Sequence, residues 1–423
     1  MKSRDLSRFA TSACIAAAML AGCGGTQPPI GVLRTVSPMR ALPQTSYKLV
    51  YHFQGGSNGS DLVAPMIDVN GTFYGTTYAG GGSGCFDRLG CGTVYSLTPS
   101  GSEKVLYAFT GGSDGSHPAA ALTDVDGTLY GTTEYGGGKG CKKRGCGTVY
   151  SVTINGSEKV LHRFTGAPDG AYPVASLVNV RGTLYGTTRE GGTSERCKRN
   201  RSILGCGTVY AITTRGAETV LYSFADRPDG AYPQAPLIDV NGTLYGASAG
   251  GGAHNVGTVY SVSTSGSEKV LHSFRDAPDG AFPYAGLIDV NGVLYGTTWA
   301  GGRTFCLESG GPCGTVYRVT TSGAETVLYT FTFDGRDGAA PQAGLTYVHG
   351  TLYGTTYYGG IDGVQGYGTV FSVTMAGKEH VLHIFVPETK NGNAAYPRAS
   401  MIDVDGTLYG NTSSGGDVFA LTP

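Results

Sequence analysis

The sequence predicts an all-β fold, a seven-bladed β-propeller of four-stranded blades. Three observations predict it: a short phrase that recurs seven times, four strand-like runs in each repeat, and an offset between the two ends of the array. The phrase is Gly-Thr-Leu-Tyr-Gly or a near copy, and successive copies are 56, 55, 60, 50, 58 and 56 residues apart. A period near 50 residues is typical of an array built from one supersecondary unit.

The second repeat illustrates the four strands in order. An apolar run at 121–125 leads to Asp126-Gly127, which favours a tight hairpin because both residues tolerate positive φ. The second strand covers 128–133, a glycine-rich loop follows, and the third strand covers 147–153. The fourth strand covers 158–164, and a connection ending in Ala-Tyr-Pro leads into the next repeat. Val, Thr, Tyr and Leu dominate these runs, and no helical period is sustained.

The fourth-strand phrase is out of phase with the rest of the array. Its first copy, at 47–53, precedes any complete repeat, and the last repeat ends at 417–422 after its third strand. An open β-solenoid, the alternative fold, would leave both sheet edges exposed to aggregation. In a ring, the N-terminal strand instead completes the C-terminal blade. We therefore expect residues 46–423 to form the closed propeller.

The N-terminal segment has the features of a targeting signal. Three basic residues precede a mostly apolar stretch at 9–20, and the tetrapeptide at 20–23, Leu-Ala-Gly-Cys, resembles the lipobox of bacterial lipoproteins. This resemblance implies a signal peptide at 1–22, lipidation of Cys23 and, because glycine follows the cysteine, sorting to the outer membrane. Residues 23–45 are expected to be a flexible tether that anchors the protein by lipid alone. A plain secretory peptide is the alternative.

Eight further cysteines fall in four local pairs, each within the loop between the second and third strands of a repeat. Repeats that lack one member of a pair lack both, which is the pattern that disulfides in an oxidising compartment produce. The predicted disulfides are Cys85/Cys91, Cys141/Cys146, Cys197/Cys206 and Cys306/Cys313. Zinc half-sites are the alternative, and no recurrent His or Asp accompanies the pairs to favour it.

The repeat phrases resemble the GloVer tandem repeat, also called the Gloeo_Verruco repeat, of exported bacterial proteins. The matching residues include Gly182–Thr188 with the Gly-Gly that follows it, Gly207–Tyr210 and Val220–Phe224. The resemblance covers nearly all of residues 47–423. It implies an exported repeat architecture and implies no activity, cofactor or catalytic residue.

Several recurrent polar residues are interpreted as architecture. Two Gly-x-Ser-x-Gly matches, at 55–59 and 111–115, lack the helix that a hydrolase nucleophile elbow requires. Aspartates before glycine recur in the loops between blades and favour turns, with a calcium or catalytic carboxylate as the alternative. These are Asp114, Asp169, Asp229, Asp279 and Asp337. His162, His272 and His383 occupy a position that other repeats fill with Tyr, and they are spread around the ring. We therefore expect neither a metal site nor a cofactor.

Candidate ligand-binding residues lie where the repeats differ, at the end of the second strand. Exposed aromatic rings beside charged groups suit the recognition of a sugar or peptide, with tolerated drift as the alternative. The candidates are Tyr78, Glu134, Tyr135, Arg189, Glu190, Trp299, Tyr357 and Tyr358.

A basic sector is predicted on the neighbouring loops of blades one to three. Its residues are Arg88, Lys142, Lys143, Arg144, Lys198, Arg199 and Arg201. The sector could meet an anionic polymer, and solvated loop tips are the alternative. The net charge of −1 gives no general attraction to nucleic acid.

No convergent catalytic set is present, so the sequence favours a non-enzymatic, lipid-anchored binding or scaffold module for carbohydrate or protein at the cell envelope, expected to be a monomer. The alternative is a polysaccharide lyase or glycoside hydrolase that uses Glu134, Arg189 and Glu190 on the propeller face. A purely structural envelope protein is a third possibility.

Overall fold

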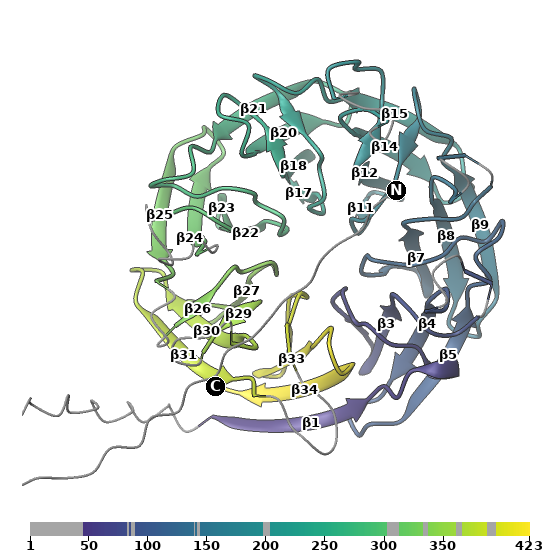
Figure 1. The fold of residues 1–423 in the computed structure, drawn as a ribbon, viewed down its shortest axis with the longest axis horizontal. Helices are drawn as coiled ribbons and strands as arrows, with labels where there is room; N and C mark the ends of the chain where they lie inside the picture. Colours follow the sequence, from purple (N-terminus) through teal and green to yellow (C-terminus); the bar gives the residue numbers. More distant parts are fainter. Residues whose placement is uncertain are drawn as a thin grey trace, which may run out of the picture. The chain divides into compact units, whose positions relative to one another are not determined.

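The computed structural model describes residues 45–82, 84–85, 89–138, 140–141, 144–197, 204–302, 313–332, 337–360, 366–386 and 395–423. Within them, seven four-stranded antiparallel sheets follow one another around a ring (Figure 1), and these residues form no α-helix. The predicted seven-bladed propeller is confirmed. The signal segment, Cys23 and the tether up to residue 44 lie outside the described residues. In the part described, no helix has the length and apolarity needed to span a membrane.

The first four blades are regular. Blade one contains β2 (Ile67–Val69), β3 (Thr72–Thr77), β4 (Thr93–Leu97) and β5 (Glu103–Ala108). Blade two contains β6 (Thr123–Val125), β7 (Thr128–Thr133), β8 (Thr148–Thr153) and β9 (Glu158–Arg163). Blade three contains β11 (Val178–Val180), β12 (Thr183–Thr188), β14 (Thr208–Thr213) and β15 (Glu218–Ser223). Blade four contains β17 (Ile238–Val240), β18 (Thr243–Ser248), β20 (Thr258–Ser263) and β21 (Glu268–Ser273).

The remaining blades include the one that closes the ring. Blade five contains β22 (Ile288–Val290), β23 (Val293–Thr298), β24 (Thr315–Thr320) and β25 (Glu325–Thr330). Blade six contains β27 (Thr346–Val348), β28 (Thr351–Thr356), β30 (Thr369–Thr374) and β31 (Glu379–Ile384). Blade seven contains β32 (Ile402–Val404), β33 (Thr407–Asn411), β34 (Asp417–Thr422) and the N-terminal β1 (Ser46–His52).

Short ribbons join the loops of neighbouring blades. They pair β10 (Gly170–Ala171) with β13 (Glu190–Gly191), β16 (Gly230–Ala231) with β19 (Gly250–Gly251), and β26 (Gly338–Ala339) with β29 (Tyr358–Gly359). One 3-10 turn, η1 (Gly56–Asn58), lies between β1 and β2. Isolated bridges make the same contact at the other four connections, so each interblade connection is paired with the exit of a second strand, which is where the functional candidates were predicted.

Every first hairpin has positive φ at both turn residues, as the Asn-Gly and Asp-Gly pairs predict. Asn70 and Gly71 have φ of 55° and 79°. Arg181 and His349 adopt the same left-handed conformation, with φ of 54° and 45°, although neither side chain favours it. The glycine that follows each of them supplies the second positive φ, and the pairing of the strands on either side fixes the turn.

The core lies between the blades. In blade four, Gly246 of β18 pairs with Tyr260 of β20, and a Cβ at Gly246 would come within 2.6 Å of the tyrosine hydroxyl. The glycine therefore makes room for a fully buried ring. Phe224 of the preceding blade meets Tyr260 edge to face, with ring centroids 4.9 Å apart. Equivalent Phe–Tyr or Phe–Phe contacts recur between other neighbouring blades, so each blade packs mainly on the next.

The ring closes by strand pairing between the two ends of the propeller domain. β1 pairs antiparallel with β34, with Ser46 opposite Thr422 and His52 opposite Asp417 (purple beside yellow in Figure 1). The N–H of Phe53 donates to the carbonyl of Gly416 at 2.9 Å, which extends the ladder beyond the strand. The predicted docking of residues 47–53 beside 417–422 is confirmed.

The outer junctions between blades bury carboxyl groups beside tyrosine. At the junction of blades three and four, the Tyr222 hydroxyl donates to Asp229 Oδ2 at 3.0 Å, and Glu268 lies close enough to influence its pKa. Burial, and then the neighbouring Asp229, raise the pKa of Glu268 from its usual 4.5 to about 7. The folded protein therefore binds a proton at Glu268 more tightly than the unfolded chain does.

We expect Gly246→Ala to lower the free energy of unfolding by about 1–3 kcal/mol, because the added methyl overlaps the Tyr260 ring and Leu237. Chemical denaturation of the two proteins measures the difference. The control is Tyr260→Phe, which removes a buried hydroxyl without a hydrogen-bond partner and should be nearly neutral. Blades six and seven already carry Phe371 and Phe419 in this position. Equal stability of Gly246→Ala and the parent would contradict the packing argument.

We expect Glu268 to make stability pH-dependent. Its raised folded-state pKa contributes stability that is present below about pH 4.5 and is lost as the pH rises towards 7. Glu268→Gln should therefore gain stability relative to the parent between pH 5 and pH 8 in denaturation curves. Asp289→Asn, at an exposed position of β22, is the control and should leave the pH profile unchanged. Parallel profiles for the parent and Glu268→Gln would rule the effect out.

Candidate functional site

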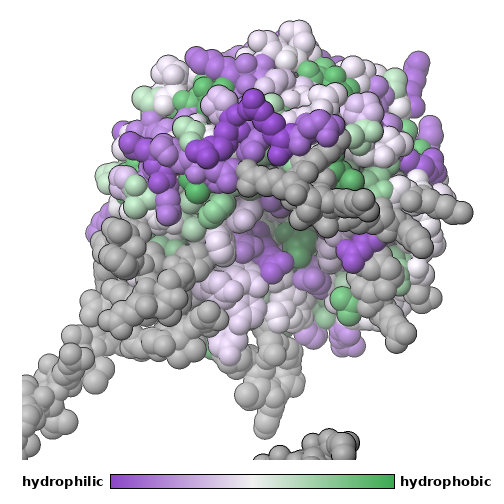
Figure 2. Space-filling model, turned by 45° about the horizontal axis from the view of Figure 1, so that its top comes forward, coloured by the Kyte–Doolittle hydropathy of each residue, from purple (hydrophilic) through white to green (hydrophobic). Residues whose placement is uncertain are grey.

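A cavity of about 680 Å³ lies at the centre of the ring, because residues from all seven blades line it. In a space-filling view the visible face is hollowed near its middle, where hydrophilic and hydrophobic residues lie side by side (Figure 2). Four of the eight predicted ligand-binding residues line this cavity: Tyr78, Glu134, Arg189 and Trp299. Each directly follows the second strand of its blade, β3, β7, β12 or β23.

A second ring of variable residues lines the same cavity, and the sequence analysis missed it. These residues follow the proline, or in blade one the leucine, at the end of each interblade connection. In chain order they are Val63, Ala119, Val174, Gln234, Tyr284, Gln342 and Arg398. Sequence variation could have identified these residues, because the position after the proline varies between repeats as much as the position after the second strand does.

Backbone geometry links the variable residues that follow the second strands to the variable residues that follow the prolines. The residue before the proline has positive φ in each blade that carries the proline, for example 57° at His117 and 59° at Tyr172. Its carbonyl accepts the N–H of the residue after the second strand: Glu134 donates to His117 and Arg189 donates to Tyr172, both at 3.1 Å. The left-handed connection thus places two variable side chains at the cavity, one that follows the second strand and one that follows the proline.

The most polar part of the lining is a hydrogen-bonded set from blades one to three. Arg189 Nη1 lies 3.0 Å from Glu134 Oε1, and the Tyr78 hydroxyl donates to Glu134 Oε2 at 2.9 Å. The Glu134 side chain is 8% exposed, so its charge depends on these partners. Burial, and then the Glu134 carboxylate, raise the pKa of Tyr78. Burial alone would lower the pKa of Arg189, but Glu134 and neighbouring groups raise it above its usual value.

A second charged pair lies where blade one meets blade seven. Asp61 and Arg398 both line the cavity. Burial raises the pKa of Asp61, and the charge of Arg398 and then that of His117 partly offset the rise. Arg398 Nη2 also donates to the Tyr357 hydroxyl at 3.0 Å, and its guanidinium carbon lies 4.9 Å from the centre of the Tyr357 ring. Tyr357 therefore supports the cavity through Arg398.

The aromatic part of the lining belongs to blade five. Trp299 and Tyr284 meet edge to face with centroids 6.1 Å apart, and Phe282 lies 6.3 Å from Trp299. The indole nitrogen of Trp299 is buried and has no hydrogen-bond partner among the described residues. A buried N–H donor without a partner is costly in the free protein and is available to a ligand oxygen.

The Gloeobacter/Verrucomicrobia repeat family matches the chain over residues 30–198 and 198–422. The chain belongs to this family. No curated protein sequence matches this repeat protein.

Solved structures show the same fold. The virginiamycin B lyase of Staphylococcus aureus is 14% identical, with a TM-score of 0.57 over 90% of this chain and 100% of the lyase. The GH74 enzyme of Niastella koreensis is 15% identical, with a TM-score of 0.54 over 88% of this chain and 53% of that enzyme. Identities this low indicate a shared fold and carry no activity across.

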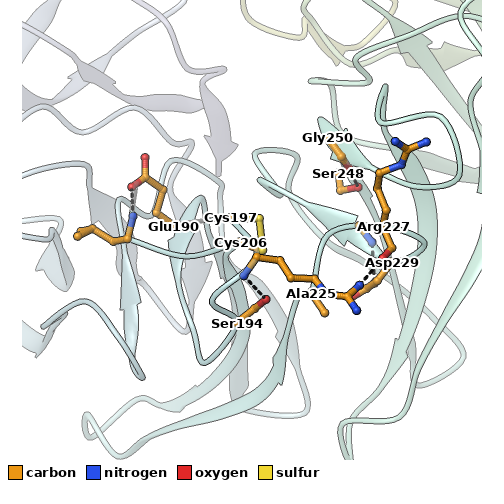
Figure 3. Close-up of a disulfide and its surroundings, with 12 residues drawn as sticks. Glu190, Ser194, Cys197, Cys206, Ala225, Arg227, Asp229, Ser248 and Gly250 are labelled. Atoms are coloured by element: carbon orange, nitrogen blue, oxygen red, sulfur yellow. Dashed lines mark hydrogen bonds between the residues drawn. A yellow bond between two sulfur atoms is a disulfide. The ribbon is translucent and has the colours of Figure 1, made fainter. Parts of the chain in front are cut away.

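The other predicted residues of the repeat protein lie behind the cavity lining. Tyr135 packs edge to face on Tyr172, with centroids 5.5 Å apart. Glu190 Oε2 accepts the N–H of Leu204 at 3.0 Å, within the loop that the Cys197–Cys206 disulfide closes (Figure 3). Tyr358, in β29, packs against Tyr357 with centroids 4.6 Å apart. Glu190 is not among the residues that line the cavity, whereas Glu134 is.

Three of the four predicted disulfides are present in the described loops: Cys85–Cys91, Cys141–Cys146 and Cys197–Cys206. Cys313 is disulfide-bonded, and Cys306 lies outside the described residues. These bonds indicate an extracellular or periplasmic protein.

Of the predicted basic sector only Arg144 is described, and its guanidinium carbon lies 5.8 Å from the centre of the Tyr135 ring. The other six residues lie outside the described residues: Arg88, Lys142, Lys143, Lys198, Arg199 and Arg201.

Two sets of side chains among the described residues could hold a metal ion. They are His162 with Asp169 and Glu218, and His272 with Asp279 and Glu325. Neither set lines the central cavity.

We expect Arg189→Met to lower the free energy of unfolding by about 2–3 kcal/mol, because it leaves the buried Glu134 carboxylate without its counter-charge. Adding Glu134→Gln to Arg189→Met should recover part of the loss. Urea denaturation of the parent, the single variants and the double variant measures the coupling. Arg318→Met, at an exposed position of β24, is the matched control and should change little. Additive effects of the two single variants would contradict the pairing.

Proposed function

We propose that this protein is a non-enzymatic binding module that holds a carbohydrate in its central cavity at a bacterial cell envelope. The observation that carries the proposal is the composition of the cavity. An aromatic wall formed by Trp299 and Tyr284 shares a space of about 680 Å³ with the Glu134–Arg189 ion pair. Ligand sites of comparable volume combine apolar surface with a few placed polar groups.

Carbohydrate suits this lining better than other small ligands do. A sugar ring presents apolar C–H faces to aromatic side chains and presents hydroxyls to amides and charged groups. Gln234 and Gln342 add amide donors and acceptors to the lining. The buried indole N–H of Trp299 lacks a partner that a sugar hydroxyl would supply. The two cavity carboxylates are matched by two arginines, so the site has no net attraction for a strongly charged ligand.

The proposed location combines the disulfides with the N-terminal signal. We propose that lipid on Cys23 anchors the protein at the outer membrane and that residues 23–45 tether the propeller to it. The basic sector would then face anionic polymers of the envelope. An envelope protein is the other partner that this arrangement suits, and the protein would act as a monomer.

A second candidate function, cleavage of the bound polysaccharide by hydrolysis or elimination, is favoured by one observation. Asp61 and Glu134 both line the cavity; the Tyr78 N–H donates to the backbone carbonyl of Asp61, and the Tyr78 hydroxyl donates to Glu134 Oε2. The raised pKa of Asp61 suits a general acid. Glycosidases use two carboxyl groups of this kind, one protonated and one charged. Asp61 replaces Glu190 as the partner of Glu134 in this hypothesis.

We expect the purified protein to bind specific glycans on a carbohydrate array, and Trp299→Ala to weaken that binding at least tenfold, a loss of about 1.4 kcal/mol. Titration calorimetry with the best array ligand measures the change. Tyr347→Ala is the matched control, because Tyr347 is an exposed aromatic residue of β27 outside the cavity lining. Tyr347→Ala should bind the glycan with the same affinity as the parent protein.

The same titrations separate the alternatives. Equal binding by Trp299→Ala and the parent would exclude the aromatic wall as the site. Capture of an envelope protein that competes with no glycan would favour a protein ligand. Loss of the bound glycan with time, abolished in Asp61→Asn, would establish the enzymatic alternative.

A further inference from the structure

The outer junctions between blades share a three-residue arrangement. An aromatic ring comes from the fourth strand of one blade, an Asp or Asn from the connection, and a Glu from the start of the next fourth strand. Tyr222, Asp229 and Glu268 illustrate it: the tyrosine hydroxyl donates to Asp229 Oδ2, and Glu268 lies close enough to influence its pKa. At the junction of blades one and two, the Tyr107 hydroxyl donates to Asp114 Oδ2, and Glu158 lies close enough to influence its pKa.

Histidine replaces the tyrosine at two of these junctions, and the result is a set of potential metal ligands. His162 of β9, Asp169 and Glu218 of β15 meet between blades two and three. His272, Asp279 and Glu325 meet between blades four and five. Within each set, the ligand atoms all lie within 4.8 Å of one another.

The junction at His162 leaves acceptors that the protein does not satisfy. His162 Nε2 hydrogen-bonds Asp169 Oδ2 at 3.3 Å. Asp169 Oδ1 is buried without a hydrogen-bond partner, the only junction aspartate oxygen of which this is true among the described residues. Glu218 Oε1 is buried and unpaired too, as are the Oε1 atoms of Glu103, Glu158, Glu268 and Glu325. The fully buried Tyr210 hydroxyl also has no partner and lies within electrostatic reach of both carboxyl groups.

We propose that His162, Asp169 and Glu218 bind a divalent first-row transition ion, with zinc as its most suitable member. One imidazole nitrogen and two carboxylate oxygens form a ligand set that suits Zn²⁺ and does not suit Ca²⁺, which takes oxygen ligands. Three protein ligands leave the fourth position of a tetrahedral ion for water. The ion would connect the outer strands of blades two and three.

In the set formed by His272, Asp279 and Glu325, an arginine competes with a metal ion for the aspartate. Arg275 Nε lies 3.3 Å from Asp279 Oδ2, so a guanidinium already partly neutralises that carboxylate. The corresponding residue at the first set is Thr165, whose N–H and hydroxyl donate to Asp169 without adding charge. The site at His162 is therefore the tighter of the two, and the site at His272 is weaker.

The third histidine of the series provides a natural contrast. His383 stacks on Tyr47, with ring centroids 3.9 Å apart and planes 1° from parallel. Strand register places Tyr47 where the other junctions have the glutamate, because Tyr47 faces Leu421 as Glu218 faces Ile212. Histidine alone therefore does not define the site, since the carboxyl group from the next blade is also required.

Zinc titration of the purified protein, followed by calorimetry and a competing chromophoric chelator, tests the proposal. We expect one tight equivalent and one weaker equivalent of zinc per chain. His162→Tyr should lower the affinity of the tight equivalent at least tenfold and should fold, because tyrosine occupies this position at four other junctions. His254→Ala, at an exposed loop histidine, is the control for adventitious binding and should keep the tight equivalent.

Two further measurements make the result decisive. At a concentration that fills only the tight equivalent, zinc should raise the thermal unfolding midpoint of the parent and raise that of His162→Tyr much less, because the ion binds the folded state alone. Arg275→Thr should tighten the weaker equivalent towards the affinity of the first. Equal zinc affinity in the parent and His162→Tyr, or no binding by either protein, would overturn the proposal.

Discussion

The antiparallel pairing of β1 with β34 is the constraint on which the rest of the structure depends. It gives blade seven its fourth strand and turns seven separate sheets into a ring without a free sheet edge at the seam. The ring in turn brings Asp61 of blade one beside the charge of Arg398 of blade seven, although 337 positions separate them in the chain. An open array of the same repeats would have no central cavity, because its lining requires all seven blades.

Repetition allows the cavity to vary without disturbing the frame. Glycine opposite a buried tyrosine, a left-handed first turn and a Phe–Tyr contact between blades recur around the ring. The side chains at the cavity depend on none of these contacts, since they follow the strand or the proline that the frame fixes. Trp299, Arg189 and Ala249 therefore occupy equivalent positions on the same repeated backbone. The function of such a protein is encoded in what differs between its repeats.

The sequence predicted the blades, the seam and four of the residues that line the cavity, and the reasons for the remainder are structural. Phrases such as Gly-Thr-Leu-Tyr-Gly carry strand and turn information locally, so the fold could be inferred from them. Tyr135 and Glu190 were placed in the site because they adjoin Glu134 and Arg189, but successive residues of an extended chain point in opposite directions. The variable residues that follow the interblade prolines were missed because their position depends on a left-handed residue and on hydrogen bonds between separate segments.

The outer junctions show how one substitution changes the chemistry of a repeated contact. The Tyr222 hydroxyl donates to Asp229, and the raised pKa of Glu268 favours a neutral carboxyl group beside it. At His162, a ring nitrogen hydrogen-bonds one oxygen of Asp169, and the other oxygen remains buried and unsatisfied. Burying such an acceptor costs more than the lost hydrogen bond would contribute. A cation that binds all three groups removes this cost, which gives a physical reason for histidine at a position where tyrosine already suffices.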